Sequence, residues 1–359
     1  MSAAPRTHWT PKLASTFASK FALKLTGGFA LGLLAATLGP AEQATASPAD
    51  DPPPTWRFRE KAKPVKVMVL AGSIGAWPKN PYAEHIENWC SNVEVKNLSK
   101  TGYGAYYLRK RFMQQVVKNG YVNLRNPDYE YWLVFQGGLN SVGMPEKTNK
   151  EIRQLFLSAH KRGISVVGLS LTPWGDDSDK RRWRGTAGLL YKERTQIVVD
   201  FVTGQSQPKQ ALGKYIDRRD DPNAPWDPAE LADIGIDLYD SELRDRNAPL
   251  RDVAKLRAEL SKSKKWRKAH EGLNEYQLDQ ALDRDAQEAA EIPRWYLREE
   301  LRSFDHIHPN EDGHRLLAEI ACPKLPSSWS CACPPIGSGA ASKAKPKQAE
   351  AKAQDQAAK

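Results

Sequence analysis

The sequence has no apolar run that would cross a membrane comfortably, and its longest one lies near the start. Residues 25–38 form a short apolar stretch rich in Gly and Ala, which follows a basic region ending at Lys24. Ala44, Thr45 and Ala46 then give a small-x-small pattern. This order is typical of a secretory signal. We therefore predict a signal peptide over residues 1–46, cleaved after Ala46, and an exported protein, periplasmic or secreted. An uncleaved N-terminal membrane anchor is the alternative.

The chain also lacks a concentrated basic region within its expected folded part. The formal net charge of the whole chain is +10. Residues 1–46 carry four Lys or Arg against Glu42, and residues 337–359 carry five Lys against Glu350 and Asp355, so each end contributes about +3. The net charge left for the folded part is therefore small. We expect no nucleic-acid partner, because binding one requires positive charge clustered on the fold.

Cysteine is scarce, and its four copies are Cys90, Cys322, Cys331 and Cys333. An even number in an exported protein predicts disulfides. Cys331 and Cys333 are too close in sequence to pair easily with each other, so we expect each to bond elsewhere. Cys90 paired with one of the other three would tie the C-terminal segment to the first helix. The connectivity stays open, and a zinc site is a weaker alternative.

Five short apolar runs alternate with helix-prone segments between residues 65 and 239. The expected strands are 65–70, 93–98, 131–135, 164–169 and 234–239. Continuous apolar runs of this length indicate buried strands of a parallel sheet. We therefore predict an α/β fold, a three-layer α/β/α sandwich with a mainly parallel sheet.

Three segments fall outside this alternation. Residues 47–62 form a Pro-rich linker, and residues 337–359 form an Ala/Lys-rich tail that we expect to be disordered. Residues of about 240–300 are charged and helix-prone, and they predict a helical insertion before the last loop. This insertion is either a solvated cap or a substrate lid.

Polar or glycine-rich loops follow the expected strands, at the edge where parallel sheets bind ligands. Ser73 follows the first strand, Gly102 the second and Asn140 the third. The last loop, Asp305 to His308, precedes an Asn310 that is suited to begin a helix. These residue types supply a nucleophile, donors for an oxyanion, a base and a carboxylate that orients the base. Together they predict an acyl-transfer site.

These loops resemble the sequence blocks of the SGNH, or GDSL-type, hydrolases, a superfamily of esterases, lipases and carbohydrate acyl-esterases with a flavodoxin-like sandwich. Ser73 and Ile74 match the first block, where Gly72 replaces the usual Asp. Gly102 matches the second block, and Gly138 with Asn140 the third. Residues 305–314 match the Asp-x-x-His-Pro-Asn block and its later Gly-His. The resemblance implies a hydrolase domain over residues 63–336.

The resemblance also implies a role for each matched residue. Ser73 would be the nucleophile, His308 the base and Asp305 the residue that orients His308. The backbone N–H groups of Ser73 and Gly102 and the side chain of Asn140 would form the oxyanion hole. The implied function is a serine esterase that works through an acyl-enzyme. With the predicted export, we expect it to remove an acyl group, in our prediction acetyl, from a carbohydrate or similar small ester outside the cytoplasm.

Several alternatives remain at the sequence level. His306 and His314 compete with His308 as the base, and Asp305 with His306 and His308 could bind a metal, although we expect neither metal nor cofactor. A non-catalytic protein that binds an envelope component or a glycan is the rival function. Trp174 is the candidate substrate contact, among tryptophans that we expect to be exposed: Trp174, Trp183, Trp266 and Trp295. Association with the cell envelope is a possible partnership, and the oligomeric state is open.

Overall fold

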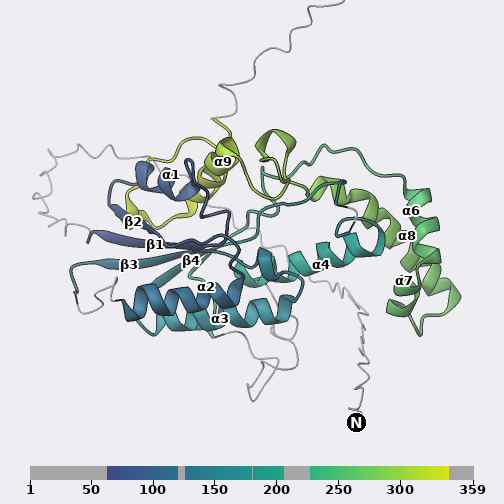
Figure 1. The fold of residues 1–359 in the computed structure, drawn as a ribbon, viewed down its shortest axis with the longest axis horizontal. Helices are drawn as coiled ribbons and strands as arrows, with labels where there is room; N and C mark the ends of the chain where they lie inside the picture. Colours follow the sequence, from purple (N-terminus) through teal and green to yellow (C-terminus); the bar gives the residue numbers. More distant parts are fainter. Residues whose placement is uncertain (1–62, 120–125, 180, 206–226, 339–359) are drawn as a thin grey trace, which may run out of the picture. The chain divides into compact units, whose positions relative to one another are not determined.

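The computed structural model of the chain describes residues 63–119, 126–179, 181–205 and 227–338. Five strands form one parallel sheet in the order β2-β1-β3-β4-β5 (Figure 1). The strands are β1 (Val65–Ala71), β2 (Val93–Asn97), β3 (Glu130–Gln136), β4 (Ser165–Leu169) and β5 (Ile234–Ile236). The predicted α/β sandwich with a parallel sheet is confirmed. Because β2 and β3 lie on opposite sides of β1, the crevice between the carboxyl ends of β1 and β3 is the place where such sheets bind ligands.

Helices cover both faces of the sheet (Figure 1). α1 (Tyr82–Trp89) and α9 (Glu311–Ala321) cover one face, and α2 (Ala105–Phe112), α3 (Pro145–His160) and α4 (Gly185–Val202) pack on the other. Side chains alternate along β1 accordingly. Val67 and Val69 belong to the core on the α1/α9 side, whereas Met68 and Leu70 belong to the core on the α2/α3 side. This burial on both faces explains why β1, like the buried strands β3 and β4, reads as a nearly continuous apolar run.

The segment between β5 and α9 contains three helices, α6 (Val253–Lys262), α7 (Lys264–Ala269) and α8 (Glu275–Glu291). They lie beyond α4 in Figure 1, and α8 contacts both α4 and α6. Buried Trp266 and Ala286 join the same core as α2 and α3. The predicted helices of this segment are therefore present, and they extend the core beside α4.

Short turns of other helix types complete the described chain. A π-helix spans Met113–Lys118 after α2. The 3₁₀ turns are Leu139–Ser141, Pro228–Glu230, Ile292–Trp295, Glu299–Leu301, Cys322–Lys324 and Ser327–Trp329.

Two disulfides fix the C-terminal segment. Cys90 at the end of α1 bonds Cys331, and Cys322 at the end of α9 bonds Cys333. The predictions that Cys90 pairs with a C-terminal cysteine, and that Cys331 and Cys333 each pair elsewhere, are confirmed. All four cysteines are in these two bonds, so none of them is a free thiol.

Three of the predicted segments lie outside the described residues: the signal peptide over 1–46, the linker over 47–62 and all but the first two residues of the tail. Among the residues that the structure describes, no helix has the length and apolar character needed to span a membrane.

Candidate active site

Ser73 lies in the tight turn directly after β1, at the crevice between β1 and β3. Gly72 precedes it, and the backbone is closely surrounded there. A Cβ atom at position 72 would lie 3.3 Å from the carbonyl oxygen of Tyr103 and 3.4 Å from the amide nitrogen of Asn140. The turn therefore brings the loops after β2 and β3 against the backbone beside Ser73. Glycine has no Cβ atom, so Gly72 permits this close approach at the position where the resembled sequence block usually has Asp.

His308 links Ser73 to Asp305. The Nε2 atom of His308 lies 2.6 Å from the Oγ of Ser73, and its Nδ1 atom hydrogen-bonds the Oδ2 of Asp305. An ionised carboxylate only accepts hydrogen bonds, so Nδ1 carries the proton and Nε2 is free to accept the serine proton. The structure thus brings together three residues that are 232 and 235 positions apart in sequence, counted from Ser73.

The second oxygen of Asp305 is held by three donors. Its Oδ1 accepts hydrogen bonds from the Ser303 hydroxyl at 3.1 Å, the Ile307 N–H at 3.1 Å and the His308 N–H at 3.0 Å. Burial alone would raise the pKa of Asp305, but the hydrogen bonds from His308 and Ile307 outweigh it and hold the pKa below its ordinary value. Asp305 is therefore fixed as an anion with its other oxygen facing the imidazole.

The loop that carries Asp305 and His308 is closed at its base and anchored to α9. The Ser303 N–H donates to the His308 carbonyl at 2.8 Å. Asn310 caps α9 by accepting from the Gly313 N–H at 3.0 Å, and its amide donates to the carbonyl of Glu300 at 2.8 Å. The predicted N-cap at Asn310 is confirmed, and it ties the loop that carries the imidazole to a helix that packs against the sheet.

The loops after β2 and β3 carry candidate donors for an oxyanion. The Asn140 amide donates one hydrogen to the Tyr103 carbonyl at 3.2 Å, which leaves its second hydrogen available. Gly102 has a φ of +78°, a conformation that favours glycine. Within the described part of the chain, the N–H groups of Ser73 and Gly102 have no hydrogen-bond partner. These are the three donors that the family resemblance implies.

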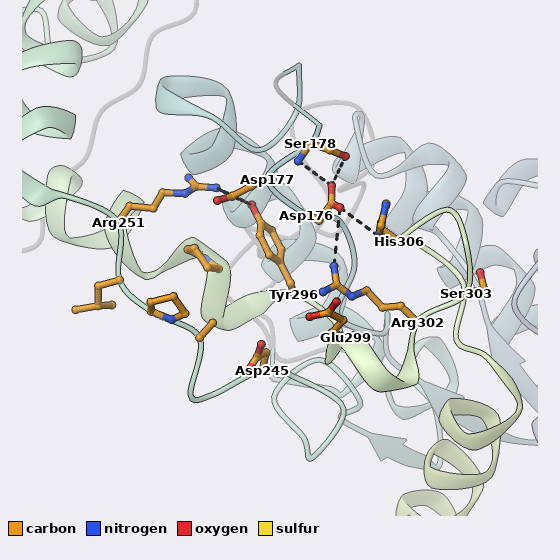
Figure 2. A pocket seen from close by; sticks show the side chains of 14 residues that line it. Asp176, Asp177, Ser178, Asp245, Arg251, Tyr296, Glu299, Arg302, Ser303 and His306 are labelled. Carbon is orange, nitrogen blue, oxygen red and sulfur yellow. Dashed lines mark hydrogen bonds and ion pairs between the residues drawn. The ribbon is translucent and has the colours of Figure 1, made fainter. Parts of the chain in front are cut away.

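His306 lines a cleft of about 640 Å³ (Figure 2). Its Nδ1 atom lies 3.1 Å from Asp176, and its side chain is 43% exposed. Burial raises the pKa of Asp176, but the Ser178 hydroxyl and the charge of His306 together lower it below its ordinary value. His306 and Ser303 line this cleft, whereas Ser73 does not. The cleft is therefore a neighbour of the triad, on the side of the insertion.

His314, the other competing base, is fully buried. Its ring lies between those of Tyr82 and Trp77, with centroids 6.2 and 5.8 Å away, and the Trp77 ring in turn stacks on His308 at 5.7 Å. Burial, together with the charges of His85 and His308, lowers the pKa of His314 to about 3. His314 is thus a neutral packing residue behind the site. Sequence reasoning missed Trp77, whose only signal was its position four residues after Ser73.

The predicted exposure of the tryptophans is wrong for three of the four. Trp174 is 1% exposed, and Trp183 and Trp266 are equally buried, whereas Trp295 is half-buried. The Trp174 ring packs edge-on against Trp183 at 4.6 Å, and its Nε1–H donates to the Thr195 hydroxyl at 3.3 Å. A ring enclosed in this way has no face left for a substrate. The prediction that Trp174 contacts substrate is therefore wrong.

Solved structures with some likeness to this chain include ester hydrolases. No protein-family profile and no curated protein matches the chain. An acetyl xylan esterase, AlAXEase, is 16% identical, with 73% of this chain and 100% of that chain covered at a TM-score of 0.38. A GDSL-like lipase from Bacteroides thetaiotaomicron is 11% identical, with coverages of 72% and 85% at 0.38. An esterase, EstA, from a Pseudoalteromonas species is 8% identical, with coverages of 72% and 95% at 0.34.

One of these neighbours is named a GDSL-like lipase, a term used for the superfamily that the sequence resembles. At such TM-scores, the function of this chain is argued from its own site.

Proposed function

We propose that this protein is a serine hydrolase of the SGNH/GDSL type that cleaves carboxylic esters through an acyl-enzyme. The observation that carries the proposal is the continuous chain of hydrogen bonds from Ser73 through His308 to the anchored carboxylate of Asp305. This chain lies at the carboxyl edge of the sheet, where the strand order reverses. The N–H groups of Ser73 and Gly102 and the second amide hydrogen of Asn140 are available there as hydrogen-bond donors.

The arrangement performs acyl transfer in two steps. His308 Nε2 takes the proton of Ser73 as Oγ attacks the ester carbonyl, and the imidazolium then gives this proton to the departing alkoxide. Water attacks the resulting acyl-serine with His308 again acting as the base, which releases the carboxylic acid and restores Ser73. Asp305 holds the imidazole in the required tautomer and stabilises its charge in both steps.

The donors around Ser73 stabilise the oxyanion of each tetrahedral intermediate. The N–H groups of Ser73 and Gly102 and the second amide hydrogen of Asn140 are assigned to this role. Removing one such donor typically costs about 10²–10³ in kcat. Asn140 is fixed by its bond to the Tyr103 carbonyl, so its amide is oriented before substrate arrives.

We propose that the acyl group is acetyl and the acceptor a carbohydrate or similar small alcohol, and that the protein acts after export. The two disulfides support export, because such bonds persist in oxidising compartments. An acetyl-release screen on acetylated glycans tests the substrate, and N-terminal sequencing of the mature protein tests cleavage after Ala46.

The central test compares the wild type with Ser73→Ala and His308→Ala on 4-nitrophenyl acetate and with a fluorophosphonate probe. We expect the probe to label Ser73, and each variant to lose about 10³-fold or more of kcat. His306→Ala is the matched control, since this imidazole faces Asp176 and not Ser73, and it should keep near-wild-type kcat. Equal turnover in all four proteins, without labelling of Ser73, would instead favour the non-catalytic binding protein.

A further inference from the structure

Three tyrosines and a methionine form an exposed surface beside the candidate active site, which we call the tyrosine shelf: Tyr103, Tyr106, Tyr107 and Met144. Tyr106 is 46% exposed, Tyr107 55% and Met144 53%. The ring of Tyr107 lies between the other two, with centroids 5.5 Å from Tyr103 and 5.2 Å from Tyr106. In the part of the chain that is described, no hydrogen-bond partner is found for the three hydroxyls. Large side chains that are exposed in a group and unpaired mark a binding surface more often than scattered ones do.

The tyrosine shelf is continuous with the residues around Ser73. The backbone carbonyl of Tyr103 accepts a hydrogen bond from the Asn140 amide. The same carbonyl oxygen would lie 3.3 Å from a Cβ atom placed on Gly72. Tyr106 and Met144 line a hollow of about 370 Å³ whose wall includes Ser141, the residue after Asn140. An ester bound at Ser73 with its carbonyl oxygen at Asn140 therefore has the shelf as its neighbour.

The charge around the tyrosine shelf is positive. Residues 95–119, which include α2, contain six Lys or Arg and no Asp or Glu. The Nζ of Lys110 lies 5.5 Å from the ring centre of Tyr106, and Lys147 and Lys150 line the hollow beside it. Within the described ranges these three lysines form no salt bridge, whereas Glu151 in the same hollow is already paired with Arg109 at 2.6 Å. The lysines are thus available to an anion.

We propose that the tyrosine shelf binds the acyl acceptor of the reaction and that this acceptor is an anionic, ring-built polymer, an acidic polysaccharide. Sugar rings stack on tyrosine faces while their hydroxyls bond the phenol groups. Carboxylates on the rings pair with Lys110, Lys147 and Lys150. The inference rests on the proposed esterase function for the placement of the acyl group at Ser73, and it adds where the rest of the substrate lies.

An anionic membrane surface is the competing occupant for basic and aromatic side chains. The shelf favours the polymer, because its aromatic members all carry a hydroxyl and Met144 is its one purely apolar member. Membrane-binding surfaces instead bury a larger apolar area beneath their basic residues.

The test measures binding of polygalacturonate to the full-length chain carrying Ser73→Ala, so that binding is followed without turnover. Tyr106→Ala with Tyr107→Ala should weaken binding about tenfold or more. The triple change Lys110→Gln, Lys147→Gln and Lys150→Gln should weaken it similarly, and should flatten its dependence on salt. The tyrosine and lysine variants are also made with Ser73 intact. Their kcat/KM for 4-nitrophenyl acetate should stay near the wild-type value, because this small ester has no polymer that the shelf could bind.

Matched controls are provided by the insertion. Tyr276→Ala removes a tyrosine that is 72% exposed on α8, and Lys264→Gln, Lys265→Gln and Lys268→Gln remove the same charge from exposed positions on α7. Both controls should bind polygalacturonate like their parent. Circular dichroism and thermal unfolding of every variant separate loss of binding from loss of fold.

Each outcome decides the inference. Loss of polygalacturonate binding in the shelf variants, with binding kept in the controls, supports it. If the wild type does not hydrolyse 4-nitrophenyl acetate, this result contradicts the proposed esterase function alone, and the binding result still stands. Equal binding of polygalacturonate by shelf and control variants, or no binding by the parent that carries Ser73→Ala, overturns it. Binding to vesicles of anionic lipid that is lost in the shelf variants, with no binding of polygalacturonate, also overturns it and assigns the surface to a membrane.

Discussion

At the scale of single residues, Asp305 decides which nitrogen of His308 carries the proton. Its Oδ1 accepts three hydrogen bonds, so the oxygen of an Asn at this position would stay there and its NH₂ group would face Nδ1. That donor would force the proton onto Nε2, and His308 could no longer accept from Ser73. We expect Asp305→Asn to lower kcat about 10³–10⁴-fold on 4-nitrophenyl acetate with little change in the thermal midpoint.

Asp176→Asn is the matched control for this change. Asp176 bonds His306 and not His308, so its neutralisation should leave kcat near the wild-type value. Comparable losses in the two variants would contradict the role assigned to Asp305.

The same scale shows where sequence reasoning succeeds and fails. Ser73, Asp305 and His308 were predicted together because each lies in a short segment whose residue order carries chemical information, and the structure brings them into contact. Trp174 was not predictable in this way, because the enclosure of its ring comes from Trp183 and Thr195 on later segments. The exposure of a side chain depends on such distant neighbours, which local sequence does not report.

At the scale of elements, most strand limits were predicted closely. Four strands lie within about one residue of their expected ends, but β5 stops at Ile236 rather than at Tyr239. Asp237 ends it, because its carboxylate accepts the N–H groups of Tyr239 at 2.8 Å and Asp240 at 3.2 Å, a local turn that competes with the strand. α8 continues to Glu291, well past its last periodic leucine, because small buried Ala side chains replace the leucines.

α9 carries a residue, His314, that makes the stability of the fold depend on pH. The His314 pKa is lowered to about 3 in the folded protein, from 6.5 in an unperturbed imidazole, chiefly by burial. Between these two values the unfolded chain binds a proton that the folded chain does not. The contribution of His314 to stability is therefore complete above pH 6.5 and is lost progressively as the pH falls toward 3.

Urea unfolding at several pH values between 7 and 4 tests this sign. We expect the free energy of unfolding to fall by up to about 1.4 kcal/mol per pH unit through His314. His314→Phe keeps a ring between Trp77 and Tyr82 without a titrating group, so its slope should be smaller than that of the wild type. Identical slopes in the two proteins would count against the buried neutral imidazole.

At the scale of the whole molecule, the C-terminal segment is held by covalent bonds of very different span. Cys90–Cys331 joins residues 241 positions apart, and Cys322–Cys333 joins residues 11 positions apart. The longer bond closes almost the entire described fold into one loop, from the end of α1 to the segment after α9. In the chain-entropy view, it removes more freedom from the unfolded chain than the shorter one does.

The two bonds therefore predict unequal losses of stability. Replacing Cys90 and Cys331 by Ala should lower the free energy of unfolding by about 5 kcal/mol, against about 3 kcal/mol for the same change at Cys322 and Cys333. Trp329, just before Cys331, is fully buried in the core that includes α1 and α9.

Guanidinium unfolding of both double variants, without reductant, measures the difference, and the reduced wild type should approach the sum of the two losses. A larger loss from the shorter bond would show instead that local packing around Cys322, rather than restriction of the unfolded chain, determines what these bonds contribute.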